Sequence, residues 1–170
     1  GKRGNNPDEN TKLMMPFIED RALLRKRLLA AFETAKTLNV VDNNRIGAMG
    51  FCFGGLCALD LARSGADVKG VVSFHGLFMP PENLANEKIN AKVLALHGFD
   101  DPMVPPEQVR SLEKEMTEAD VDWQLHVYGN TKHAFTNPEA NDSTLGTIYN
   151  PIAEKRSMKA MENFFQDVLV

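Results

Sequence analysis

The segment that decides the fold of this chain is Gly50-Phe51-Cys52-Phe53-Gly54-Gly55. It follows residues 45–49, an apolar run of mostly small side chains that predicts a short buried strand. It precedes residues 56–63, which predict a helix ended by Gly65. A strand that turns directly into a helix brings neighbouring backbone close together, so the turn needs residues without a side chain on both sides of its apex. The three glycines of the segment meet that need.

Cys52 stands at the apex of this turn. In the G-x-S-x-G nucleophile elbow of hydrolases, the apex residue is a serine held above the sheet, in unfavourable backbone geometry, with a helix N-terminus behind it. A thiol at that place is activated because the helix N-terminus favours the thiolate and a nearby histidine can take the proton. The alternative is a buried cysteine in a glycine-rich turn, and the segment taken alone leaves both interpretations open.

Two nucleotide-binding motifs also place glycines between a strand and a helix. The dinucleotide fingerprint G-x-G-x-x-G requires a spacing that Gly47, Gly50 and Gly54 do not have. The phosphate-binding P-loop requires a following Gly-Lys-Ser/Thr, which is missing here. Both motifs are therefore excluded at this turn.

Composition narrows the class of protein. The chain has 170 residues, of which 43% are hydrophobic and 25% charged, as expected for one soluble globular domain. A net charge of −4 gives no basic surface for nucleic acid, and no apolar run reaches membrane-spanning length. Cys52 and Cys57 are poorly spaced for a disulfide, and no cysteine-histidine cluster has the spacing of a zinc site. We therefore expect no metal, no nucleic-acid or membrane partner, and a reducing, cytoplasmic location.

The remaining elements follow from hydrophobic periodicity. We expect a single domain spanning 1–170, in which residues 1–15 form a loop or frayed start. Apolar residues at three- and four-residue steps then predict an amphipathic helix from about Pro16 to Leu38, with a solvated basic face. Strands are predicted at 68–74, 91–96 and 122–128, helices at 105–119 and from about 152, and a functional loop or lid at 130–150. Alternating strands and helices with apolar strands predict an α/β fold, a mostly parallel sheet covered on both faces. In such sheets the chemistry gathers at the carboxyl ends of the strands.

A cysteine nucleophile needs a base, and the base needs a third group that fixes its tautomer. The candidate bases are His75, His97, His126 and His133. His126 lies within a predicted strand, and His75 and His97 precede glycines at strand ends, where a histidine often hydrogen-bonds a turn. His133 lies in the loop after the last strand and can reach the elbow.

The acid is expected in the loop after the preceding strand, which contains Asp100-Asp101-Pro102. The proline fixes a turn that can aim the carboxylate of Asp101, while Asp100 is placed to cap it. Nucleophile, acid and histidine then follow in the chain order Cys52, Asp101, His133, which is the order in hydrolases with a nucleophile elbow. Because the three residues also follow this chain order, together they support a catalytic triad more strongly than any one of them does alone.

Four motifs together resemble the dienelactone hydrolase family. They are Gly50-Phe51-Cys52-Phe53-Gly54-Gly55, His97-Gly98-x-x-Asp101-x-x-Val104-Pro105, Tyr128-x-x-x-x-His133-Ala134-Phe135-Thr136-Asn137-Pro138, and Tyr149-Asn150 leading to Arg156-Ser157. The resemblance implies an α/β-hydrolase fold and a Cys52-Asp101-His133 triad that hydrolyses esters or lactones through an acyl thioester, without a cofactor. The backbone N-H of Phe53 is the expected oxyanion donor.

The chain departs from the family pattern in two ways. Family members have further strands and a helix before the first helix predicted here, so we expect the chain to be N-terminally truncated, without those strands and without a second oxyanion donor. Members specific for dienelactone carry an arginine shortly after the catalytic histidine, where this chain has Asn137. An ester or lactone other than dienelactone itself is therefore expected as the substrate.

Aromatic side chains near these motifs suggest an apolar substrate pocket. Phe51, Phe78 and Phe135, with Asn137 beside them, could wall it, although core packing explains the phenylalanines equally well. Two other functions stay open at this point. The chain could be a non-catalytic protein of the same fold that binds a small carbonyl ligand or a partner, or a redox protein using the Cys52 thiol, with Cys57 expected to face the helix packing surface.

Overall fold

The protein is a parallel sheet layered between helices. The computed structural model describes residues 2–82, 84–85 and 87–170. The four-stranded sheet has the order β1-β2-β3-β4, and all three pairings are parallel. Its strands are β1 (Gly47–Phe51), β2 (Gly70–Phe74), β3 (Lys92–Gly98) and β4 (Trp123–Tyr128). This confirms the predicted α/β class.

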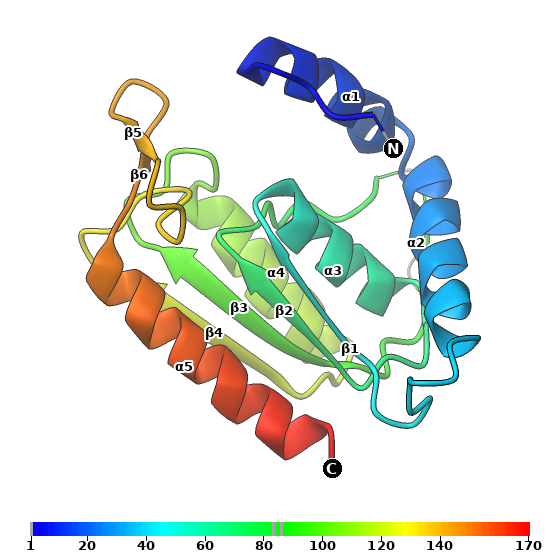
Figure 1. Cartoon of the computed structure of the whole chain (residues 1–170). Helices are drawn as coiled ribbons and strands as arrows, with labels where there is room; N and C mark the ends of the chain where they lie inside the picture. Colours follow the sequence, from blue (N-terminus) through cyan, green and yellow to red (C-terminus); the bar gives the residue numbers. More distant parts are fainter. Residues whose placement is uncertain (1, 83, 86) are drawn as a thin grey trace.

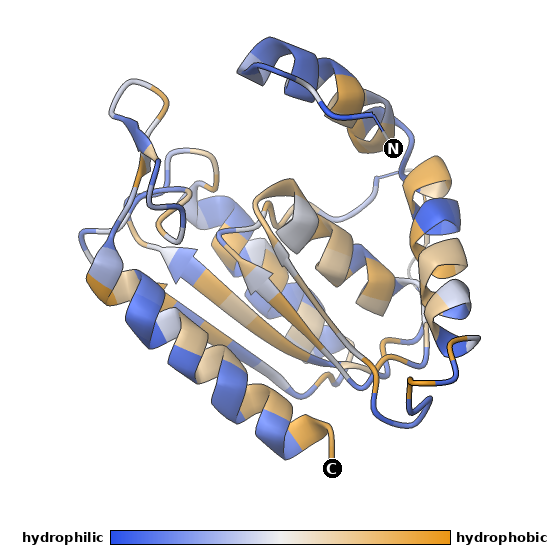
Figure 2. Cartoon of the chain, viewed as in Figure 1, coloured by the Kyte–Doolittle hydropathy of each residue, from blue (hydrophilic) through white to orange (hydrophobic). Residues whose placement is uncertain are grey.

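Helices cover both faces of this sheet (Figure 1). They are α2 (Arg21–Lys36), α3 (Phe53–Arg63), α4 (Pro106–Glu118) and α5 (Pro151–Val168). Successive side chains of a strand point to opposite faces. In β3, Val93 and Ala95 accordingly join the core under α2, α3 and α4, whereas Leu94 and Leu96 join the core under α5. The central strands β2 and β3 are mostly apolar because both faces are covered, and Figure 2 shows much of their length in the hydrophobic colours.

The N-terminal region differs from its prediction. Residues 7–15 are not a loop but belong to α1 (Pro7–Glu19), which is followed by α2 after a break at Asp20. The Asn6 side chain accepts a hydrogen bond from the Glu9 N-H at 2.9 Å, and Pro7 occupies the first turn, which together start a helix. None of the residues of α1 is buried, and Figure 1 shows α1 lying away from the sheet. Hydrophobic periodicity did not predict the start of α1, because no side chain of this helix is buried against the core.

Arg21 contradicts the predicted solvated basic face of this region. Its side chain is buried and makes two hydrogen bonds of 2.7 Å to the Asp60 carboxylate. Asp60 also pairs with the buried Arg63 at 3.1 Å, and Arg63 pairs with Glu115 at 2.7 Å. This network joins α2, α3 and α4, because each carries at least one of the charges.

The predicted loop at 130–150 contains a small sheet of its own. Strands β5 (Asn141–Asp142) and β6 (Thr147–Ile148) pair antiparallel. The backbone of His133 is bonded on both sides to this region, since its N-H donates to Gly146 O at 3.0 Å and its carbonyl accepts from the Ile148 N-H at 3.0 Å. Figure 1 shows the β5-β6 hairpin beyond the carboxyl end of β3. The hairpin therefore holds His133 at the functional edge of the sheet.

Candidate active site

The turn between β1 and α3 has the strained geometry expected of a nucleophile elbow. Cys52 has φ 54° and ψ −120°, a conformation that costs a non-glycine residue free energy. A Cβ on Gly50 would collide with the backbone carbonyl of Gly54, and a Cβ on Gly55 would lie 2.7 Å from the Ser73 hydroxyl. Both glycines are required because backbone and a neighbouring strand approach them closely.

Asp101 and His133 meet at the carboxyl edge of the sheet. The Asp101 Oδ2 and His133 Nδ1 atoms are 2.8 Å apart, and both side chains are buried. The other carboxylate oxygen accepts a hydrogen bond of 2.8 Å from the Met103 N-H, so the loop fixes the carboxylate. Because a carboxylate accepts, Nδ1 carries the proton in this bond and Nε2 is left for a second partner.

The thiol of Cys52 lies beside His133 Nε2. Among the described residues, His133 Nε2 is buried without a well-aligned hydrogen bond, yet it is close enough to the thiol for each group to change the other's pKa. Burial opposes ionisation of Cys52, but His133 and the N-H of Phe53 outweigh it and lower the thiol pKa. Burial likewise opposes protonation of His133, but the bond to Asp101 and the interaction with Cys52 raise its pKa to about 9. The arrangement favours a thiolate-imidazolium pair.

The other thiol has a different environment. Burial raises the pKa of Cys57 to about 11, and the nearby charge of Asp60 adds to this effect. Cys57 is therefore held as a neutral thiol at physiological pH, and both cysteines are free of a disulfide. This weakens the redox alternative, since a resolving cysteine reacts as a thiolate.

The remaining histidines have separate surroundings. His75 directly follows β2 and contacts the elbow, since its Nδ1 lies 3.2 Å from the Cys52 backbone nitrogen. His97 is buried against the ring of Phe78, with ring centroids 5.4 Å apart, and burial lowers its pKa. His126 is partly buried within β4. The contact of His75 with Cys52 was missed, because a histidine before a glycine at a strand end does not reveal which backbone N-H it accepts.

The predicted substrate pocket is only partly formed. Phe51 is 39% exposed and stacks on Phe74 at a centroid distance of 4.7 Å, so it remains available to a ligand. Phe78 and Phe135 are completely buried and pack in the two cores, so of the two interpretations core packing describes them in this structure. Asn137 is exposed, and its side chain accepts a hydrogen bond from the Glu139 N-H at 3.0 Å. Hydrophobic periodicity could not decide whether these phenylalanines belong to the core or to a substrate pocket, because apolar side chains occur in both.

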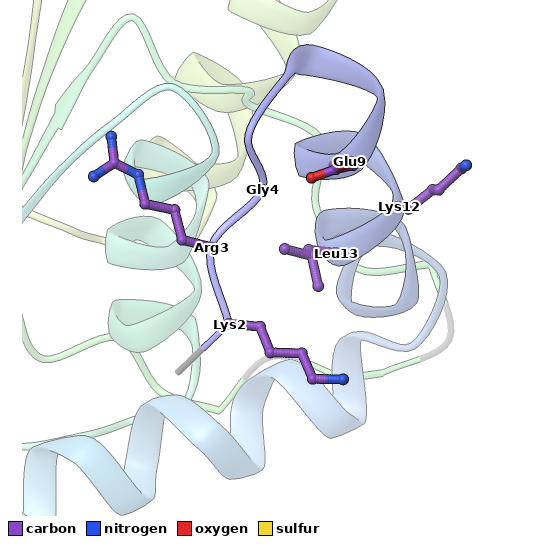
Figure 3. A pocket seen from close by; sticks show the side chains of 6 residues that line it. All are labelled: Lys2, Arg3, Gly4, Glu9, Lys12 and Leu13. Carbon is purple, nitrogen blue, oxygen red and sulfur yellow. The ribbon is translucent and has the colours of Figure 1, made fainter.

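Cavities lie elsewhere on the molecule, apart from the cluster of Cys52, Asp101 and His133. One of about 510 Å³ lies between α4 and β4, lined by His97, Phe99, Val104, Pro106, Val109, Arg110, Glu113 and Val127. Another of about 370 Å³ lies between the N-terminal segment and α1, where Figure 3 shows Lys2, Arg3 and Lys12 around Leu13. Neither cavity has Cys52 or His133 in its lining.

Within residues 2–82, 84–85 and 87–170, no three histidine, cysteine, aspartate or glutamate side chains group as ligands for a metal ion. The helices in the same ranges are too short or too polar to cross a membrane.

Comparison with known proteins identifies a protein family for this chain. A model of the dienelactone hydrolase family matches residues 1–169. The chain belongs to the dienelactone hydrolase family. It is 30% identical over 175 residues to a putative carboxymethylenebutenolidase of Aquifex aeolicus, covering 99% of this chain and 71% of that protein. It is also 37% identical over 147 residues to an uncharacterized protein of Caenorhabditis elegans, covering 85% of this chain and 93% of that protein.

Solved structures agree with this dienelactone hydrolase assignment. The protein m3DLH superposes with a TM-score of 0.92 at 37% identity, covering all of this chain and 71% of its own. A dienelactone hydrolase-like promiscuous phosphotriesterase from metagenomic libraries gives a TM-score of 0.91 at 36% identity, covering 97% of this chain and 70% of its own. These similarities confirm the α/β-hydrolase fold, and family membership makes the chain a hydrolase of the ester and lactone class.

Proposed function

We propose that this hydrolase cleaves carboxylic esters or lactones with Cys52 as nucleophile, His133 as base and Asp101 as the group that orients His133. The observation that carries the proposal is the buried 2.8 Å bond between Asp101 and His133 beside a thiol whose pKa His133 lowers. The relatives named putative carboxymethylenebutenolidase support an ester or lactone as substrate. The exposed Asn137 offers no positive charge for a substrate carboxylate, so neutral esters fit this site better than dienelactone.

Acylation begins with the proton of Cys52 on His133 Nε2. The thiolate attacks the carbonyl carbon, and the resulting oxyanion is stabilised by the Phe53 N-H, which already interacts with the thiol at the start of α3. His133 then gives its proton to the leaving alkoxide as the carbon-oxygen bond breaks. The products of this half-reaction are an alcohol and an acyl thioester on Cys52.

Deacylation uses the same groups in reverse. Neutral His133 takes a proton from water, and the hydroxide attacks the thioester carbonyl. The sulfur leaves as a thiolate, which is stabilised by the imidazolium that has just formed. Asp101 keeps its negative charge throughout and holds the imidazole in the tautomer with a proton on Nδ1. A lactone follows the same course, with the alcohol remaining part of the released hydroxy acid.

Hydrolysis of a p-nitrophenyl ester tests the proposal. We expect Cys52→Ala to abolish turnover, while Cys57→Ala, a matched change of the other cysteine, retains it. Equal rates in the native protein and Cys52→Ala would reject Cys52 as nucleophile.

A further inference from the structure

His75 contacts both segments that supply the proposed nucleophile and base. It has φ 36°, is buried, and is anchored by its own N-H, which donates to Leu96 O at 2.8 Å. Its Nδ1 accepts the Cys52 backbone N-H at 3.2 Å, a proton that is shared with Phe74 O at 3.0 Å. Its Nε2 lies 2.9 Å from Oγ1 of Thr136 in the segment that follows His133. One imidazole therefore joins the elbow to the histidine segment.

The two contacts fix the charge and the tautomer of His75. A backbone N-H can only donate, so Nδ1 has no proton, and Nε2 carries the proton that it donates to the Thr136 hydroxyl. Burial and the neighbouring charge of His133 lower the pKa of His75 to about 3, which keeps the ring neutral. The rings of His133 and Phe135 each lie 5.1 Å away, centroid to centroid, in edge-on contact. His75 is thus enclosed in one orientation with both nitrogens in use.

We infer that His75 is a positioning residue that clamps the strained elbow to the segment carrying His133, so that the Cys52 sulfur stays aligned with Nε2. The inference rests on the proposed function of Cys52 and His133. Cys52 has a positive φ, and a bond to its N-H resists relaxation of that conformation. The adjoining peptide carries the Phe53 N-H, so the same relaxation would turn the oxyanion donor away. Thr136 completes the clamp because it fixes the opposite side of the ring.

Two substitutions of His75 separate the contacts. In His75→Asn the amide oxygen can take the place of Nδ1 and accept the Cys52 N-H, and asparagine tolerates a positive φ. In His75→Gln the amide nitrogen can take the place of Nε2 and donate to Thr136, but the Cys52 N-H loses its side-chain acceptor and keeps only Phe74 O. Thr136→Val removes the other end of the clamp at similar volume, and Thr136→Ser restores its hydroxyl.

The experiment measures kcat and KM for a p-nitrophenyl ester, and the pH dependence of Cys52 alkylation by iodoacetamide in a Cys57→Ala background. We expect His75→Gln to lower kcat about 10- to 100-fold with little change in KM, the loss typical of a small misplacement of reacting groups. Its alkylation midpoint should move to higher pH. Thr136→Ser should recover much of the loss seen in Thr136→Val. His75→Asn, which keeps the Cys52 contact but not the Thr136 contact, should lose about as much kcat as Thr136→Val and less than His75→Gln.

A purely structural role gives a different pattern. His75→Gln and His75→Asn would then lose thermal stability together, while the folded fraction kept the native kcat and alkylation profile. That result would overturn the clamp. Failure of the proposed function is distinguishable, because native protein would then show no Cys52-dependent ester turnover. The alkylation profiles would still decide whether His75 tunes the thiol.

Discussion

Replacing Asp101 by asparagine tests the electrostatics of the site most severely. The pKa of His133 is raised from 6.5 to about 9, which corresponds to about 3 kcal/mol of preference for the imidazolium. Asp101, 2.8 Å from Nδ1, supplies that preference together with Cys52. In Asp101→Asn the negative charge is lost while the burial and the interaction with Cys52 remain, so the pKa of His133 should fall. An asparagine amide can also donate to Nδ1 and so favour the wrong tautomer.

The expected loss in kcat is about 1,000- to 10,000-fold, as is typical when the carboxylate of such a triad is neutralised. Iodoacetamide alkylation of Cys52 should require higher pH in the variant, because the imidazolium that stabilises the thiolate is lost. Asp100→Asn is the matched control, since Asp100 is the adjacent carboxylate and is exposed. If Asp101→Asn and Asp100→Asn both kept the native kcat and alkylation profile, the reasoning about Asp101 would be refuted.

Three further predictions concern stability and are measured by urea unfolding. Gly50→Ala should destabilise the fold by at least about 3 kcal/mol, because the added Cβ collides with backbone. Gly54→Ala has open space around its Cβ and should stabilise α3 by about 0.5–1 kcal/mol; equal effects of the two substitutions would contradict the elbow geometry. Asp60→Asn should cost about 3–5 kcal/mol, because the buried Arg21 loses the carboxylate it pairs with and Arg63 keeps only Glu115. Glu33→Gln, at an exposed pair, should cost less than about 1 kcal/mol; similar costs would argue against the buried network. Folding lowers the pKa of His75 from 6.5 to about 3, so the unfolded chain binds this proton more readily and the stability contribution is lost as pH falls from about 6.5 towards 3. Between pH 6.5 and 4.5 the native protein should therefore lose about 2 kcal/mol more than His75→Gln, and parallel pH curves would refute this.

The sequence predicted the parts of the molecule that local pattern controls. The elbow followed from glycines around Cys52, and the strands followed from continuous apolar runs, because both depend on short-range sterics and burial. The chain order of Cys52, Asp101 and His133 correctly placed three distant residues at one edge, since parallel strands bring their carboxyl ends together.

Features that depend on tertiary partners escaped prediction. Arg21 looked like one more surface cation because its partner Asp60 lies far along the chain. Phe78 and Phe135 could not be assigned to core or pocket until the packing of the sheet was known. Helix α1 was missed despite the signals of Asn6 and Pro7, since it has no buried side.

The central claim is that an acyl group passes through the sulfur of Cys52. Rapid acid quenching of the Cys57→Ala protein during turnover of a p-nitrophenyl ester, followed by mass spectrometry of its peptides, tests this claim directly. We predict that the mass of the acyl group appears on the peptide containing Cys52 and disappears when the ester is exhausted. The same quench is made in His133→Gln at raised pH, where Cys52 ionises without a base; the thioester should form slowly there and persist, because no base activates water. An adduct on another residue, or Cys52→Ala protein that turns over the ester at the native rate, would contradict the account.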